Sequence, residues 1–127
     1  MTSHPRVIVV TPSSDVAGTV TEALRETDYH VVAVSDFATA RAALERHPPD
    51  LLISEVKLGA YNGLHLAIVA HGRRAPTRAI LIGPPDPVME AEARRQRAVY
   101  LATPANDEMV LEAATRVLSE EDKPTKH

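Results

Sequence analysis

The stretch Asp50-Leu51-Leu52-Ile53-Ser54-Glu55 places three aliphatic residues in succession and then an acidic residue. Its aliphatic residues do not alternate with polar ones, which is typical of a strand that is covered on both faces of a sheet. Four other short aliphatic runs of this kind occur along the chain, at residues 7–10, 31–34, 79–82 and 99–102. The sequence therefore predicts five buried strands, of which residues 51–53 form the third.

The intervals between these runs carry the spacing of amphipathic helices. Between the first two runs, for example, Val16, Val20 and Leu24 recur at helical spacing. A residue that favours a helix N-terminus comes before each of the five expected helices, namely Ser13 or Ser14, Asp36, Asn62, Asp86 followed by Pro87, and Asn106. We therefore expect strands and helices to alternate strictly.

This alternation predicts an α/β fold with right-handed crossovers and helices on both faces of a parallel sheet. At this length the usual solution is a three-layer flavodoxin-like (βα)5 sandwich with strand order 2-1-3-4-5. In such a sheet the functional site lies at the carboxyl ends of the strands. The residues at these positions are Thr11, Pro12 and Ser13 after the first strand, Glu55 after the third, Gly83 after the fourth, and Thr103 and Pro104 after the fifth.

Length and composition limit what the chain can be. Its 127 residues are enough for one domain, which we expect to span residues 1–127 with a core over about 6–118 and a flexible tail at 119–127. A net charge of −3 provides no general attraction for nucleic acid or an anionic membrane. The chain has no Cys, no signal peptide pattern and no apolar run near 18 residues, so we expect a cytoplasmic domain.

One group of motifs makes the prediction more specific. Asp50 to Ile53 lead to the acidic Glu55, the triplet Asn62-Gly63-Leu64 follows, and Tyr100 stands three residues before Thr103-Pro104. Together with the five strand–helix units, these features resemble the receiver domains of two-component response regulators, the CheY-like family of the small chemotaxis regulator. The resemblance runs from about residue 6 to residue 118. It implies a non-enzymatic role in signal transduction or phosphorelay, with another signalling protein as partner.

The same resemblance implies a site that has lost its chemistry. Receiver domains are phosphorylated on an aspartate after the third strand, hold Mg²⁺ with an acidic pair after the first, and contact the phosphoryl group with Thr or Ser after the fourth and Lys after the fifth. The matching residues here are Glu55 at the phosphoacceptor position, then Thr11 with Pro12, Gly83, and Thr103. None is of the expected type. Pro104 and the aromatic Tyr100 are retained, and the family's proline follows a cis bond.

Physical chemistry predicts that these replacements abolish phosphorylation. Mg²⁺ requires oxygen ligands and usually one or two carboxylates, whereas Thr11 is neutral and Pro12 has no ligand atom. Phosphoryl transfer depends on positive groups that neutralise the developing charge, and Thr103 supplies none. Glu55 is one methylene longer than aspartate, which displaces its carboxylate. We therefore expect a pseudo-receiver with no metal, no cofactor and no enzymatic activity.

The clustered arginines suggest where a partner binds. Arg94, Arg95 and Arg97 stand near Tyr100 on the expected face of the fourth helix, fifth strand and fifth helix, where receiver domains commonly meet their partners. A second copy of the chain is one candidate for this face. The alternative is that these cations only complement the helix dipole. For Tyr100 we expect a half-buried ring whose hydroxyl lies in water.

Other interpretations of the cleft stay open. Glu55 is either a solvated carboxylate or an imitation of a phosphorylated aspartate. Ser13 and Ser14 at a helix N-terminus could hold a small anion or nucleotide, as in a sensor, although Glu55 would repel it. Asp15 together with Glu55 could instead serve an atypical receiver that is still phosphorylated.

Overall fold

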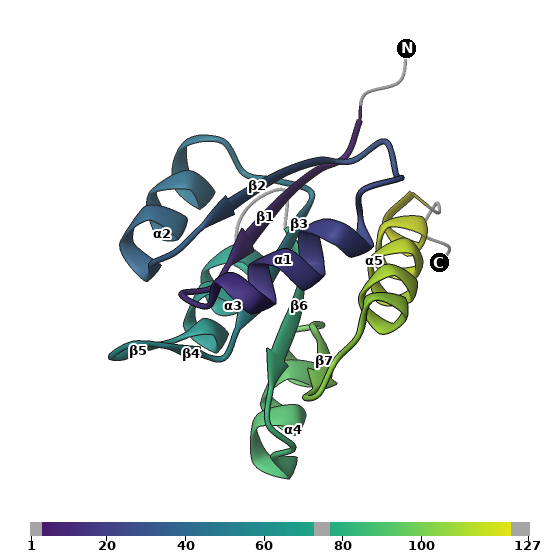
Figure 1. Ribbon diagram of the computed structural model, residues 1–127. Coiled ribbons are helices and arrows are strands. Elements are labelled where there is room, and N and C mark those ends of the chain that lie inside the picture. Colours follow the sequence, from purple (N-terminus) through teal and green to yellow (C-terminus); the bar gives the residue numbers. More distant parts are fainter. Residues whose placement is uncertain (1–3, 73–76, 123–127) are drawn as a thin grey trace, which may run out of the picture.

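The computed structural model describes residues 4–72 and 77–122. Five parallel strands form one sheet in the order β2-β1-β3-β6-β7, with β3 at its centre between β1 and β6 (Figure 1). This is the predicted order 2-1-3-4-5, once the two strands of a small separate hairpin are left out of the count. The flavodoxin-like fold is therefore confirmed, with strands β1 (Arg6–Val10), β2 (His30–Val34), β3 (Leu51–Glu55), β6 (Arg78–Gly83) and β7 (Val99–Ala102).

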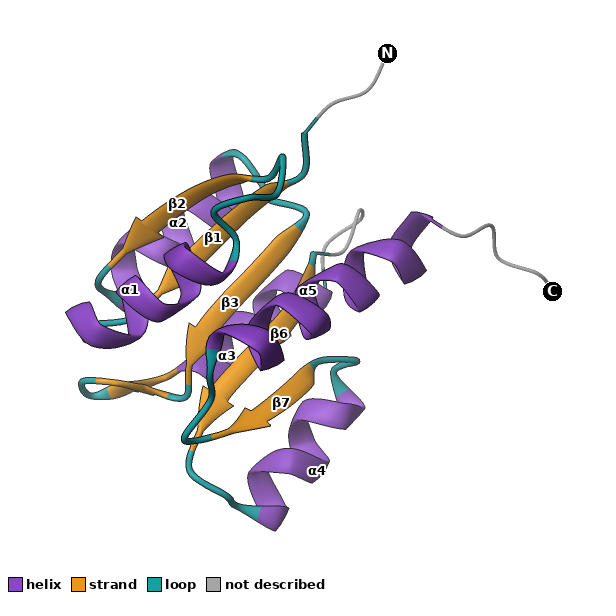
Figure 2. Cartoon of the chain, turned by 45° about the vertical axis from the view of Figure 1, so that its right-hand side comes forward, coloured by secondary structure: helices purple, strands orange, loops and turns teal. Residues whose placement is uncertain are grey.

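Helices cover both faces of the sheet, as predicted (Figure 2). Alternating strand residues supply the two cores, so that Val9, Ile53 and Ile80 are buried on one face. Val10, Leu52 and Leu81 are buried on the other. The first face is covered by α1 (Ser14–Ala23) and α5 (Asp107–Asp122), and the second by α2 (Phe37–Arg46), α3 (Gly63–His71) and α4 (Pro87–Arg95).

The predicted N-caps place the helix starts correctly. The side chains of Ser13, Asp36, Asn62 and Asp86 each accept a hydrogen bond from a backbone N–H of the first helical turn. The C-terminal end of α5 lies further along the chain than we expected. The helix continues to Asp122 and so includes part of the expected flexible tail. Residues 123–127 lie outside the described residues. Within the described ranges, no helix is both long enough and apolar enough to cross a membrane.

A small hairpin between β3 and α3 was not predicted. It pairs β4 (Lys57–Leu58) with β5 (Tyr61–Asn62), and Gly59 adopts a positive φ of 63° in the turn. The Tyr61 ring stacks on Phe37 of α2, with 4.6 Å between the ring centroids. Strands of two residues have no alternation for a sequence pattern to reveal, so the hairpin had no signal of its own.

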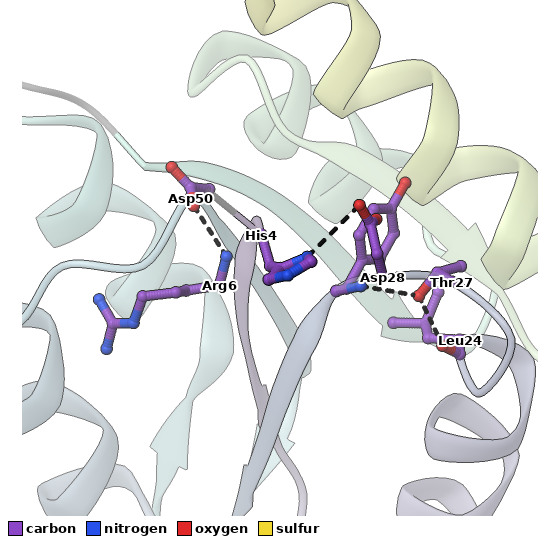
Figure 3. A network of polar contacts seen from close by, with 7 residues as sticks. His4, Arg6, Leu24, Thr27, Asp28 and Asp50 are labelled. Atoms are coloured by element: carbon purple, nitrogen blue, oxygen red, sulfur yellow. Dashed lines mark hydrogen bonds and ion pairs between the residues drawn. The ribbon is translucent and has the colours of Figure 1, made fainter. Parts of the chain in front are cut away.

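Polar contacts tie the amino ends of the strands to their neighbours (Figure 3). The backbone N–H of Arg6 donates to the Asp50 carboxylate at 2.8 Å, which links the start of β1 to the residue before β3. Nδ1 of His4 lies 3.5 Å from the Asp28 carboxylate, beside the entry to β2. This edge of the sheet is therefore held by local contacts, and the predicted site lies at the opposite edge.

Candidate functional site

The carboxyl edge of the sheet brings the predicted cleft residues together. Parallel pairing sets Val10 beside Ser54, Glu55 beside Ile82, and Gly83 beside Ala102. Thr11 follows β1 and Thr103 follows β7 by one residue each, so both lie at this edge. The structure therefore brings these residues to one edge of the sheet, and their contacts decide what that edge can do.

Thr11 and Glu55 form a direct pair across the centre of this edge. The Thr11 hydroxyl donates a hydrogen bond to the Glu55 carboxylate. Thr11 is only 4% exposed, and its oxygen also accepts from the backbone N–H of Ser13 at 2.9 Å. Glu55 is half-exposed, and Thr11 supplies a protein partner for its carboxylate that the sequence did not predict. The pairing joins residues 44 apart in the sequence, which no local pattern could reveal.

The donor atoms around this pair do not fit a Mg²⁺ site. Thr11 is neutral, and the exposed Pro12 beside it has no side-chain ligand. Asp15 lies in the first turn of α1, as expected, where a negative charge favours the helix N-terminus. In residues 4–72 and 77–122, no group of three or more His, Asp or Glu side chains could hold a metal ion. Glu55 is thus the one carboxylate of the central pair, the minimum that Mg²⁺ sites usually use, and the Thr11 hydroxyl already bonds to it.

The Gly83 position is filled by its neighbours. A Cβ atom built on Gly83 would lie 2.7 Å from the Tyr100 hydroxyl and 2.9 Å from Cγ2 of Val56. Val56 is held in place by its backbone N–H, which donates to the Ile82 carbonyl at 2.8 Å. Where the resembling family has a hydroxyl side chain, a side chain here would have to displace Tyr100 or Val56.

Tyr100 is anchored at the same point. Its hydroxyl, which we expected to contact only water, donates to the Pro84 carbonyl at 2.6 Å. Burial raises the pKa of Tyr100 above its usual value of 10, and the carboxylates of Asp86 and Glu90 raise it further. The neutral, hydrogen-bonding form is therefore favoured, and the ring stays over Gly83.

Gly63 is a site residue whose role the sequence analysis missed. We used Asn62-Gly63 as the start of a helix and as part of the motif that carries the resemblance, without a structural role for the glycine. In the structure, a Cβ on Gly63 would collide with the backbone carbonyl of Glu55 and lie 2.7 Å from the Ser54 hydroxyl. The Gly63 N–H donates to the Val56 carbonyl at 2.7 Å, which presses α3 against the end of β3. A glycine at the first position of a helix could have indicated this close approach of the backbone, since glycine has no Cβ.

The loop after β7 borders the same edge of the sheet and is bonded to the end of β6. The Thr103–Pro104 peptide bond is cis, as the resemblance implied. The Thr103 N–H donates to the Gly83 carbonyl at 2.8 Å.

Two separate hollows lie on either side of the Thr11–Glu55 pair. A cavity of about 100 Å³ between α1 and α5 is lined by Asp15 and Thr103 among mainly apolar side chains. A hollow of about 390 Å³ lies beside Thr11, Pro12 and Ser13, toward the loop after β2.

The predicted partner face divides into two parts. Arg94, Arg95 and Arg97 are exposed together around the C-terminal end of α4. Arg95 lies 3.8 Å from the Glu92 carboxylate, and Arg97 adopts a positive φ of 59° in the turn to β7. The Tyr100 hydroxyl points instead to Pro84, in the loop that precedes α4. The arginines therefore lie at the C-terminal end of α4, whereas the Tyr100 hydroxyl of β7 lies near the loop before its N-terminal end.

Comparison with solved structures gives many proteins of the same fold. A CheY-like response regulator receiver domain protein from Methanospirillum hungatei superposes with a TM-score of 0.85 at 21% identity, covering 94% of this chain and 98% of that one. For the chemotaxis response regulator CheY4 of Vibrio cholerae, the TM-score is 0.79 at 22% identity, and the match covers 91% of this chain and 99% of that protein. For a two-component response regulator from Clostridium difficile it is 0.83 at 14% identity, with 94% and 100% covered.

Sequence comparisons add nothing to this. No protein-family model matches the chain. No curated protein matches it significantly. The chain thus shares the fold of CheY-like receiver domains.

Proposed function

We propose that this chain, which has the receiver-domain fold, is a signalling module that acts by binding another protein and does not depend on phosphorylation. The observation that carries the proposal is the hydrogen bond from Thr11 to Glu55. It occupies the carboxylate at the phosphoacceptor position with a neutral side chain, where the resembling family has acidic metal ligands.

Two further features support the same conclusion. Tyr100 and Val56 occupy the space next to Gly83, so no hydroxyl at this position can contact a phosphoryl group. Thr103 stands at the lysine position and brings no positive charge. A phosphoryl group on Glu55 would therefore lack the positive charge at position 103 and the hydroxyl at position 83 that stabilise its transfer in the resembling family. What remains is a rigid edge with a fixed shape.

Treatment with acetyl phosphate and Mg²⁺ tests this part of the proposal. We expect the intact mass of the chain to stay that of the unmodified protein, because nothing neutralises the charge that develops during transfer. Beryllofluoride with Mg²⁺ should likewise leave the NMR signals of the Thr11 and Glu55 amides unchanged. A stable phosphorylated species, or beryllofluoride shifts centred on Glu55, would show an atypical but active receiver instead. Shifts with phosphate or nucleotide alone would favour a small-anion sensor.

For the partner we propose a protein with an acidic surface, bound at the α4 end that carries Arg94, Arg95 and Arg97. The three side chains are exposed around the last turn of α4 and the turn that follows it. Clustered exposed cations favour association with acidic surfaces and accelerate it. This assignment rests on their placement beside β7, on the face that the resemblance implies.

Charge reversal tests the partner face. A protein captured from the native host should bind an Arg94→Glu/Arg95→Glu variant at least about tenfold more weakly, since two attractive contacts become repulsive. The matched control is Arg25→Glu/Arg41→Glu, which makes the same change in net charge on exposed side chains outside α4. Equal binding of the two variants would contradict the assignment to α4, because it would attribute any loss to net charge alone.

A further inference from the structure

The strand β2 is an unprotected edge of the sheet. It lies at one end of the strand order, with β1 as its neighbour in the sheet. His30, Val32 and Ala33 of this strand are exposed to solvent. Val32 is 43% exposed. Natural proteins usually protect such an edge with lysine, proline, a bulge or a covering segment. The sequence His30-Val31-Val32-Ala33-Val34 contains neither lysine nor proline.

The free backbone groups of β2 can be assigned from its pairing with β1. The His30 N–H donates to the Pro5 carbonyl at 2.7 Å, and the Val34 carbonyl accepts from the Thr11 N–H at 3.0 Å. Because the bonding direction alternates along a strand, the N–H and C=O groups of Val31 and Ala33 point away from β1. These four groups are available to another strand.

An apolar groove lies beside this edge, between β2 and α2. It has a volume of about 570 Å³. Ile8, Val32 and Val34 form its floor, and α2 contributes mainly alanines, so a second helix could approach α2 closely. Ala38 and Ala42 on this side of α2 are exposed. The groove is therefore lined by small and aliphatic side chains next to unpaired backbone groups.

The charges at the two ends of α2, which flanks the groove, have opposite signs. Arg46 lies in the last turn of α2, at the end that also holds Arg6. Asp36 caps the other end of α2, where backbone and side-chain hydrogen bonds from Thr39 lower the pKa of its carboxyl group. A two-fold axis through the centre of β2 would align two copies in antiparallel directions. Arg46 of each copy would then face Asp36 of the other.

From this arrangement we infer that a second copy of the chain binds at β2, through antiparallel β2–β2 pairing with α2 packed against α2. The two-fold axis passes near Val32, and Val31 of one copy bonds to Ala33 of the other. The exposed alanines of both α2 helices and the Val32 side chains are buried together, which is the self-complementary pattern of a symmetric dimer. The α4 end remains free for a different partner.

Sedimentation equilibrium of the full chain tests the dimer. We expect the wild type to show twice the mass of the 13.8 kDa chain as concentration rises. Val32→Asp should weaken association at least about a hundredfold, because it places two carboxylates side by side at the axis. Arg46→Glu, a change at an exposed position, should weaken it about tenfold by facing Asp36 of the second copy. The amides of Val31 and Ala33 should exchange hydrogen more slowly at high concentration.

Val88→Asp is the matched control, since Val88 is 74% exposed on α4. It should dimerise like the wild type, as should Arg94→Glu/Arg95→Glu. A wild type that stays monomeric up to its solubility limit would overturn the inference. The inference would also be overturned if Val88→Asp dissociated the dimer and Arg46→Glu did not. That result would place the dimer interface at α4. Neither result bears on phosphorylation, so a failure here is distinct from a failure of the proposed function.

Discussion

Gly63→Ala is expected to destabilise the fold by about 3 kcal/mol, at the upper end of the range for overpacked sites, and to lower the melting temperature by roughly 10 °C. The added Cβ would collide with the backbone carbonyl of Glu55, which belongs to the last residue of β3. A backbone atom in a central strand cannot move aside as a flexible side chain can, so β3 or α3 must shift. Denaturant unfolding and calorimetry measure the change.

Gly18→Ala provides the matched control. Gly18 lies in the middle of α1, and a Cβ there would have no atom within 4 Å. Alanine should therefore stabilise the domain by about 0.5–1 kcal/mol, because it restricts the unfolded chain and favours the helix. If both substitutions changed stability by the same small amount, the close packing of α3 on β3 would be refuted.

Gly83→Ala is expected to cost about 2 kcal/mol and to displace Tyr100 from the cleft. The new Cβ would lie too close to the Tyr100 hydroxyl and to Val56. Neither side chain can move away without losing its present packing contacts. The hydrogen bond from Tyr100 to Pro84 should break, which contributes about 1 kcal/mol of the cost. The pKa of Tyr100 should then fall toward its ordinary value, which NMR of the tyrosine rings would report.

Two variants separate the causes of this effect. Tyr100→Phe removes the hydroxyl and should cost about 1 kcal/mol without moving the ring. In a Tyr100→Ala background, Gly83→Ala should cost at least about 0.5 kcal/mol less than in the wild type, because one of the two colliding groups is gone. A Gly83→Ala protein as stable as the wild type, with the Tyr100 signals unchanged, would show that this position is not closed.

Much of the fold was predictable because its cause is local. Unbroken aliphatic runs such as Val7 to Val10 mark strands that helices cover on both faces. Asp36 and Asp86 mark helix starts, since a carboxylate that can satisfy free N–H groups is favoured there. Alternation of the two then leaves few parallel topologies. The β4–β5 hairpin was not predictable, because its strands are too short to have a period.

The candidate site was predictable in position and not in its contacts. Strand order placed Thr11, Glu55 and Gly83 at one edge, and residue types excluded the charged chemistry of the resembling family. The structure added two contacts that the sequence did not predict, because Thr11 donates to Glu55 and Tyr100 donates to Pro84. Side-chain hydrogen bonds depend on rotamers and on loop backbone positions, which composition and spacing do not specify.

The sequence by itself determined the strand and helix pattern, the parallel sheet and the absence of the expected phosphorylation residues, because each follows from local hydrophobicity, capping or residue identity. Tertiary structure alone decided that Tyr100 and Val56 pack against Gly83, and that β2 is left uncovered beside α2. Both depend on how residues distant in sequence share space, because packing against a neighbouring element determines which side chains fill a position and which edge stays exposed.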